Sequence, residues 1–204
     1  LVRGHALDAL LAEARVDRVV SFGRRELERT HAKLEQRRVD FASFDAGDAP
    51  SPDVAVCTLG TTIKKAGSQE AFRAVDHDAV LAFARAAKQA GASRFVVVTA
   101  LGADARSSVF YNRVKGEVER DLEGLGFDAL AILQPSLLLG DRQERRFGEH
   151  LAIVASRTLA PILRPFGARP IEAELVGRAA ARLALDAAPG VVRHPSGELH
   201  ALGA

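Results

Sequence analysis

At 204 residues, 48% of them hydrophobic and 26% charged, the chain is long and apolar enough to bury a core, which excludes a disordered protein. A net charge of only +2, few aromatics and arginine pairs flanked by acids argue against a nucleic-acid surface. With one cysteine and no apolar run near the ~18 residues of a membrane span, neither a disulfide framework nor a transmembrane segment is expected. We therefore expect one domain over residues 1–204, located in the cytoplasm, with no membrane and no nucleic-acid partner.

Helical and strand patterns alternate along the chain. In order, the sequence predicts a helix over 2–14, strands over 18–22, 39–41 and 54–59, a helix over 69–90, a strand over 94–99, a helix over 108–124, a strand over 129–133, helices over 148–160 and 172–187, and an edge strand within 191–202. The charged stretch 26–35 is expected to be a short surface helix or a loop.

The strands fix the fold class. They are continuous apolar runs, which is typical of strands buried on both faces of a parallel sheet. Their alternation with helices implies right-handed crossovers. The fold class is therefore α/β, a doubly wound, Rossmann-like parallel sheet with a small C-terminal region on the substrate side.

A sheet of this kind has its first strand at the centre, and the turn after that strand cradles phosphate at a helix N-terminus. The first predicted helix already starts near Leu1. We therefore expect a strand and a glycine-rich turn ahead of Leu1. Gly4 is either a remnant of that turn or an ordinary first-turn glycine.

Open parallel sheets bind ligands at the carboxyl ends of their strands. Gly23, Arg24 and Arg25 follow the strand over 18–22. An acid at this place would bond the ribose of NAD, whereas the planar fork of arginine suits the extra phosphate of NADP. This pattern predicts NADP(H) as cofactor, with Asp40 bonding the adenine amino group; the alternative is a solvated arginine pair.

Two further strand ends supply candidate cofactor contacts: Leu59, Gly60, Thr61 and Thr62, and then Pro135 and Ser136. Glycine permits close backbone approach, and hydroxyls can bond a ribose or a phosphate. The last pair would lie at the nicotinamide end. An ordinary strand-end turn has a similar composition, so each of these candidates is weak alone.

Tyr111, the only tyrosine, stands four residues before Lys115, one of five lysines. Four residues make about one helical turn, so the two side chains share a face. A cation beside a phenol favours the phenolate and lowers its pKa from about 10 toward the working range. Such a pair can pass a proton to or from a carbonyl or alcohol oxygen. Thr99, at the end of the strand over 94–99, would orient that oxygen; the competing interpretation is a helix with an exposed lysine and a half-buried tyrosine.

Cys57 lies within an apolar run. We interpret it as a small buried hydrophobe rather than a nucleophile. No metal site is predicted.

Several short motifs follow one another in a recognisable order: Thr58-Leu-Gly-Thr-Thr62, Ala66-Gly67, Val75-Asp76, Gly102-Ala-Asp104, Ser107-Ser108, Tyr111, Val114-Lys-Gly-Glu-Val-Glu119, Leu138 and Gly140-Asp-Arg-Gln-Glu144. In these motifs the chain resembles the Tat-interacting-protein oxidoreductases, which are atypical short-chain dehydrogenase/reductases with an NAD(P)-binding Rossmann domain. The resemblance runs from the first helix to the tail and is strongest over residues 54–150.

The resemblance implies roles for the candidate residues. It implies an NADPH site and an active-site pair, as follows: Arg24 and Arg25 at the adenosine phosphate, Thr61 and Thr62 near the ribose and phosphates, and Tyr111 with Lys115 as the pair. The strand-end serine usual in the wider superfamily is matched here by Thr99, followed by Ala100. That departure bears on catalytic competence.

Three hypotheses therefore stay open. The first is an NADP-dependent oxidoreductase acting on a small carbonyl or alcohol substrate. The second is a non-catalytic NADP(H)-sensing regulatory or scaffolding protein. The third, disfavoured by the short C-terminal region, is a sugar-nucleotide epimerase or dehydratase. Analogy with the superfamily suggests a homodimer formed through the two long helices.

Overall fold

All strand pairings in the described part of the chain are parallel. The computed structural model describes residues 1–41, 44, 51–139 and 169–204. One sheet has the order β3-β4-β5-β8, and two separate pairs are β1-β2 and β6-β7. The strands are β1 (Val19–Gly23), β2 (Leu34–Arg38), β3 (Val54–Cys57), β4 (Arg94–Val98), β5 (Ala129–Gln134), β6 (Leu138–Leu139), β7 (Ile171–Glu172) and β8 (Gly190–Pro195). The parallel α/β fold class is confirmed.

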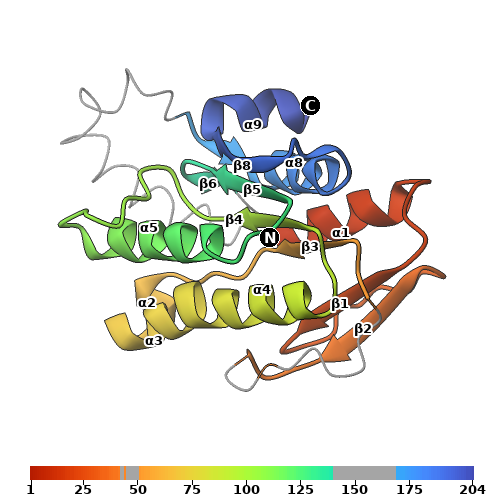
Figure 1. The fold of residues 1–204 in the computed structure, drawn as a ribbon, viewed down its shortest axis with the longest axis horizontal. Coiled ribbons are helices and arrows are strands. Elements are labelled where there is room, and N and C mark those ends of the chain that lie inside the picture. The colour runs from red at the N-terminus through yellow and green to blue at the C-terminus, as the bar shows by residue number, and fades with distance from the viewer. Residues whose placement is uncertain (42–43, 45–50, 140–168) are drawn as a thin grey trace.

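Helices cover both faces of the four-stranded sheet (Figure 1). One layer holds α1, α8 and α9, and the other holds α4 and α5. The helices are α1 (Val2–Ala12), α2 (Ile63–Ala66), α3 (Gln69–Arg73), a π-helical turn (Ala74–Asp78), α4 (Ala79–Gln89), α5 (Phe110–Glu123), α8 (Ala173–Asp186) and α9 (Ser196–Leu202).

The alternation of side chains along β4 explains why that strand has no polar face. Val96 and Val98 pack into the layer of α1 and α8, whereas Phe95 and Val97 pack into the layer of α4 and α5. All four side chains are buried. Burying a side chain of this size contributes roughly 1.5–3 kcal/mol, so this strand stabilises both cores at once.

The strand expected over 39–41 is wrong, whereas residues 26–33 form a loop, one of the two alternatives expected over 26–35. The strand β2 lies at Leu34–Arg38 instead, paired with β1. The sequence of β2 is mostly polar. Its side chains form ion pairs and hydrogen bonds with nearby residues of the same chain and do not pack into a hydrophobic core. Glu35 pairs with Arg18, and Gln36 Nε2 donates to Leu27 O at 2.9 Å. A strand with no apolar face has no hydrophobic period to reveal it.

The helix expected over 69–90 is interrupted by the π-helical turn Ala74–Asp78. The edge strand expected within 191–202 is confirmed: it is β8, which lies beside β5 at one edge of the four-stranded sheet and is followed by α9. The helix expected over 148–160 lies outside the described residues. No helix within the described ranges is long and apolar enough to cross a bilayer.

The β1-β2 pair lies beside α1 and α4 (Figure 1). The ring of Phe22 in β1 stands 6.2 Å from the ring of Phe83 in α4, edge to face. Helix α1 in turn packs closely on α8, because a Cβ on Gly177 would come 2.6 Å from His5 Cβ. The start of α1 meets the carboxyl end of β1 through Arg3, whose Nη2 donates to Arg25 O at 3.3 Å.

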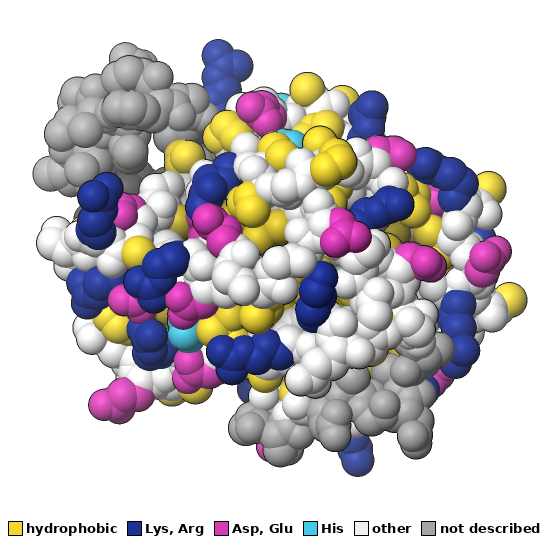
Figure 2. All heavy atoms as spheres, viewed as in Figure 1, with side chains coloured by type: hydrophobic (Ala, Val, Ile, Leu, Met, Phe, Trp, Pro, Cys, Tyr) yellow, Lys and Arg dark blue, Asp and Glu magenta, His cyan; other side chains and the backbone are white. Residues whose placement is uncertain are grey.

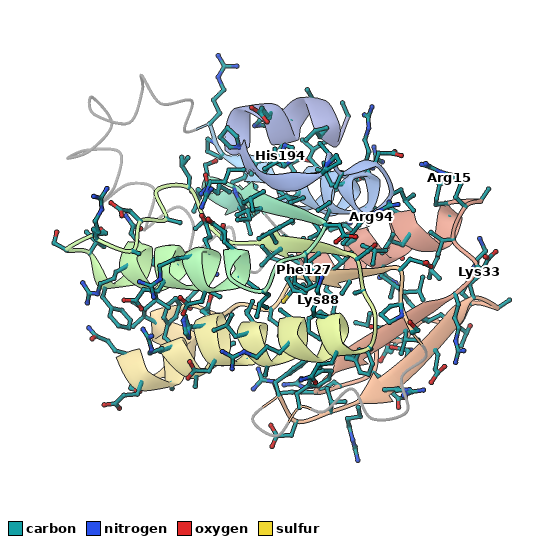
Figure 3. The ribbon with its side chains drawn as sticks, viewed as in Figure 1. Arg15, Lys33, Lys88, Arg94, Phe127 and His194 are labelled. Carbon is teal, nitrogen blue, oxygen red and sulfur yellow. The ribbon has the colours of Figure 1, made fainter. Side chains whose placement is uncertain are left out.

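Several basic residues near the amino ends of the strands have partners that stabilise the fold (Figure 3). Arg94 donates to Leu185 O near the end of α8 at 2.6 Å, and Arg15 pairs with Asp186 at 2.8 Å. Lys88 donates to Gly126 O at 2.7 Å and lies over the Phe127 ring. Cations at helix ends satisfy the last carbonyls there, so these side chains stabilise the fold rather than form a site.

Candidate active site

Helix α5 carries both members of the Tyr111–Lys115 pair, as the spacing predicts. Its apolar positions turn toward the core, and Val114, Val118 and Leu122 are buried. Lys115 is buried with them, with its side chain 5% exposed. A lysine ammonium at this depth needs a partner, because an unpaired buried charge is very costly.

That partner is Asp76, which lies in the π-helical turn. Lys115 Nζ stands 2.8 Å from Asp76 Oδ1, and the aspartate side chain is 1% exposed. The other carboxylate oxygen accepts a hydrogen bond from Thr61 N at 2.8 Å. Gly60 lies against this ion pair, because an added Cβ would be 3.3 Å from Asp76 Oδ1 and 3.8 Å from Lys115 Nζ.

Asp76 was missed as a site residue in the sequence, although a signal was present. The inward residues Phe72 and Val80 stand four positions before it and four after it. That spacing places a carboxylate on the buried face of a helix. Buried carboxylates are rare unless paired, so the position alone points to a partner cation.

Tyr111 is half-buried, and its ring lies 5.5 Å from that of Phe72. Burial raises the pKa of the phenol above its usual value; Lys115 acts to lower this pKa, and Asp76 acts to raise it. The lowered pKa expected from the sequence is therefore wrong. The physical reason is that desolvation outweighs the ammonium, whose charge is offset by the neighbouring carboxylate.

Thr99 follows β4 and is buried, but its hydroxyl is directed to Glu119. The distance from Thr99 Oγ1 to Glu119 Oε1 is 2.6 Å. Glu119 also accepts from Gln134 Nε2 at 3.0 Å and from Arg193 Nε at 3.2 Å. The single hydroxyl proton of Thr99 is thus given to a buried carboxylate. In this geometry it is not donated to a substrate oxygen, which corrects the expected role.

Three arginines, Arg3, Arg24 and Arg25, lie near the carboxyl end of β1. Gly23 is buried, while Arg24 and Arg25 are exposed. Arg3, in the first turn of α1, donates to Arg25 O at 3.3 Å, and its Nη1 would lie 2.2 Å from a Cβ on Gly23. Burial and the charge of Arg29 lower the pKa of Arg3. An open cavity of about 580 Å³ is lined by Arg3 and Arg29 and also by the acids Glu26 and Glu28.

Arg3 was not singled out from the sequence, yet it precedes Gly4, the glycine noted there. Arg3 donates to the backbone carbonyl of Arg25, and the neighbouring Arg29 pairs with Asp8 at 2.8 Å. Across the face seen in Figure 2, Lys and Arg are interspersed with Asp and Glu among the coloured atoms.

The remaining candidates lie at the carboxyl edge but are not all free for a ligand. Thr62 caps α2 by accepting from Lys65 N at 3.2 Å. Ser136 donates to Arg169 O and accepts from Ser196 Oγ at 3.0 Å. Asp40 is exposed just after β2, Leu59 is half-buried, and Pro135 O accepts from Leu101 N at 2.9 Å. The structure therefore brings Gly60 and Thr61 to the Lys115–Asp76 pair, whereas Thr62 and Ser136 make local hydrogen bonds.

No cluster of three or more potential metal-ligating side chains occurs within the described ranges. The one cysteine, Cys57, is buried, and burial raises the pKa of its thiol to about 12. It is therefore not a nucleophile in this conformation.

Relatives decide the family, although no family model matches the chain. The chain is 32% identical over 203 residues to the mitochondrial protein fmp52 of Emericella nidulans, covering 94% of this chain and 86% of that protein. The rat protein HTATIP2 is 42% identical over 151 residues, covering 72% of this chain and 62% of HTATIP2. The chain belongs to the family of the Tat-interacting-protein oxidoreductases. Membership supports an NAD(P)-binding, short-chain dehydrogenase/reductase-like oxidoreductase with a nicotinamide dinucleotide cofactor.

Solved structures agree on the fold. MoeE5 in complex with UDP-glucose and NAD superposes with a TM-score of 0.70 at 16% identity, covering 95% of this chain and 72% of that one. A short chain dehydrogenase family protein from Francisella tularensis gives a TM-score of 0.67 at 11% identity, covering 97% and 93%. At these identities the likeness concerns the fold alone.

The cytoplasmic location expected from composition is corrected by the same relatives. The fmp52 proteins of Emericella nidulans, Aspergillus niger and Aspergillus fumigatus are each named as mitochondrial. A single cysteine indicates a compartment in which thiols stay reduced. It does not identify which of the reducing compartments that is.

Proposed function

We propose that this protein is an NADP(H)-dependent oxidoreductase that reduces a small carbonyl substrate, or oxidises the matching alcohol, with Tyr111 and Lys115 as the acid/base pair. The observation that carries the proposal is the buried Lys115–Asp76 pair beside the Gly60–Thr61 turn, one helical turn from the only phenol. When bound, the nicotinamide supplies or accepts hydride.

Tyr111 suits the role of proton donor. Because its pKa is raised, the phenol is protonated at neutral pH. It can give that proton to a carbonyl oxygen as charge develops there. The ammonium of Lys115 then stabilises the phenolate that remains. A protonated phenol favours the direction of reduction.

The residues present fit a phosphorylated dinucleotide. Arg24 and Arg25 are exposed at the end of β1, with Arg3 beside them. Guanidinium groups bind phosphate with two parallel hydrogen bonds. Gly60 has no Cβ and so lets the Asp76–Lys115 pair lie close to the backbone after β3, and the Lys115 ammonium would be the group to bond a ribose hydroxyl.

A second candidate function is NADP(H) sensing without turnover, and one observation favours it. Thr99 donates to Glu119, so no hydroxyl at this strand end is set to donate to a substrate oxygen. A site that binds the dinucleotide but lacks this donor would report redox state rather than catalyse. The epimerase hypothesis rests only on the fold, since structures that share it here are under 25% identical.

Titration calorimetry with NADPH, NADP and NADH, paired with a screen of carbonyl substrates, tests the proposal. The oxidoreductase is expected to bind NADPH and to consume it with at least one carbonyl, and Tyr111→Phe is expected to lose about 10²- to 10⁴-fold in turnover. Binding without turnover would favour the sensor. Unchanged turnover by Tyr111→Phe would refute the acid/base assignment.

A further inference from the structure

His77 is a buried titratable side chain that the proposed reaction does not use. It lies in the π-helical turn, and its side chain is 8% exposed. Its Nδ1 stands 2.7 Å from Asp78 Oδ1 in the same turn, and its Nε2 stands 3.0 Å from Asp121 Oδ2 on α5. The imidazole ring therefore links the π-helical turn to the helix that carries Tyr111.

The number of protons on this ring decides whether both contacts are hydrogen bonds. A carboxylate can only accept, and a neutral imidazole donates from one nitrogen only. Burial acts to raise the pKa of the Asp121 carboxyl, but hydrogen bonds from Arg120 and His77 lower that pKa below its usual value, so Asp121 stays ionised. Only a protonated ring, which donates from both nitrogens, satisfies two carboxylates at once.

Charged groups of both signs surround the ring. They are Asp78 in its own turn, Asp121 and Arg120 on α5, and Arg73 on α3, which pairs with Glu117 on α5. Four positions further along the chain, Leu81 of α4 is apolar and buried. Arg120 bonds Asp121 through Oδ1, and Arg73 bonds a different acid. Asp78 Oδ1 and Asp121 Oδ2 are thus left to the imidazole.

We propose that His77 is a proton-dependent clasp between the π-helical turn and α5: the protonated ring bonds both carboxylates, and the neutral ring releases one of them. Histidine is the side chain that changes its charge near neutral pH. The same turn carries Asp76, whose Oδ2 accepts from Thr61 N at 2.8 Å, so a looser turn would disturb the strand-end turn of the candidate site. That effect on the site rests on the proposed function, whereas the clasp itself does not.

The pH dependence of stability tests the clasp. The second bond is present below about pH 6.5, where a histidine of the unfolded chain titrates, and is lost as the pH rises. The glutamine of His77→Gln does not change its charge. This variant should therefore increase the unfolding equilibrium constant about tenfold more at about pH 5.5 than at about pH 8.5. Urea denaturation at the two pH values measures the constants.

His31→Gln is the matched control. His31 is exposed, and its Nδ1 accepts from Lys33 N at 3.2 Å. A protonated ring cannot make that bond, so the effect of this variant should not shrink as the pH rises. The clasp is overturned if the effect of folded His77→Gln is the same at both pH values or larger at the higher one.

Asp121→Asn keeps the ring and changes its partner. An amide can accept from a ring N–H or donate to a bare ring nitrogen, so it suits both charge states of His77. The stability of this variant should depend less on pH than that of the unaltered chain, and an equal dependence would refute the clasp. Should neither variant fold, nitrogen NMR of the unaltered chain carries the test. At about pH 5.5 both ring nitrogens of His77 should hold slowly exchanging protons, and a single such proton would refute the proposal.

Exchange of the Thr61 amide reports the effect on the site, because that amide donates to the same turn. Corrected for its intrinsic rate, its exchange should quicken between about pH 5.5 and about pH 8.5 in the unaltered chain but not in His77→Gln. Unchanged exchange in the unaltered chain would overturn the effect on the site. None of these measurements needs a cofactor or a substrate, so they hold even if a carbonyl screen finds no turnover.

Discussion

Gly116 in α5 lies directly against the backbone of Ala105. A Cβ on this glycine would stand 2.1 Å from Ala105 N, closer than any real contact. The same loop is tied to the helix by a hydrogen bond from Asp104 N to Asn112 O at 3.0 Å. This close approach holds the segment that leads into Tyr111, and it explains a glycine inside a helix, where glycine otherwise costs about 1 kcal/mol.

We expect Gly116→Ala to lower the free energy of unfolding by about 1–3 kcal/mol, because the backbone must move apart to admit the methyl group. Gly197→Ala in α9 is the matched control, since a Cβ there meets nothing within 4 Å. Urea denaturation of the two variants checks the difference. Equal stability of both would contradict the close approach.

The raised pKa of Tyr111 predicts a loss of stability in alkali. The folded state holds the phenolic proton more tightly than the unfolded chain, whose tyrosine titrates near pH 10. The resulting stabilisation is fully present below that pH and is lost as pH rises through the folded value. Tyr111→Phe lacks the titrating group, so its urea midpoint should fall less steeply above about pH 10. Parallel curves for both chains would argue against the shift.

Cofactor preference should depend on the arginines after β1. Replacing Arg24 and Arg25 by alanine is expected to weaken NADPH binding by about 10- to 100-fold, because each lost guanidinium removes charge-assisted hydrogen bonds to the phosphate. Binding of NADH should change little. Arg178→Ala, which removes an exposed arginine on α8, serves as the control. Calorimetry with both dinucleotides checks the selectivity, and an equal loss for both would place the phosphate elsewhere.

Cys57 should resist thiol reagents while the protein is folded. Its side chain is 2% exposed, and burial raises the pKa of the thiol to about 12. At pH 8 little thiolate is available, and the reagent must wait for the chain to open. Labelling by an aromatic disulfide should therefore be slow in buffer and fast in urea. Rapid labelling of the folded chain would show that β3 is accessible.

The buried strands were predictable because their pattern has one cause. Residues 95–98 and 129–133 are buried between the two helix layers, so each of these positions favours an apolar side chain. In β2 the side chains instead bond to Arg18 and to the backbone of Leu27. No periodic signal marks such a strand, and only the pairing with β1 defines it.

Within the site, spacing along one helix was enough to pair Tyr111 with Lys115. It was not enough to give the sign of the pKa shift, because that depends on Asp76 and on burial. Thr99 shows the same limit. Its place at the end of β4 followed from the pattern, but the direction of its hydroxyl depends on Glu119, twenty residues away.

The separation of β1-β2 from the four-stranded sheet has a consequence for amide hydrogen exchange. Among the described strands β1 pairs only with β2, over five registered positions from Val19 to Gly23. Segments with few buried contacts open locally at lower free energy than the core. Deuterium should therefore enter β1 and β2 well before it enters β4. If Arg24 and Arg25 hold a phosphate, adding NADPH should slow deuterium uptake first in β1. The exchange rate of the β1-β2 strand pair would then report how much of the protein has cofactor bound.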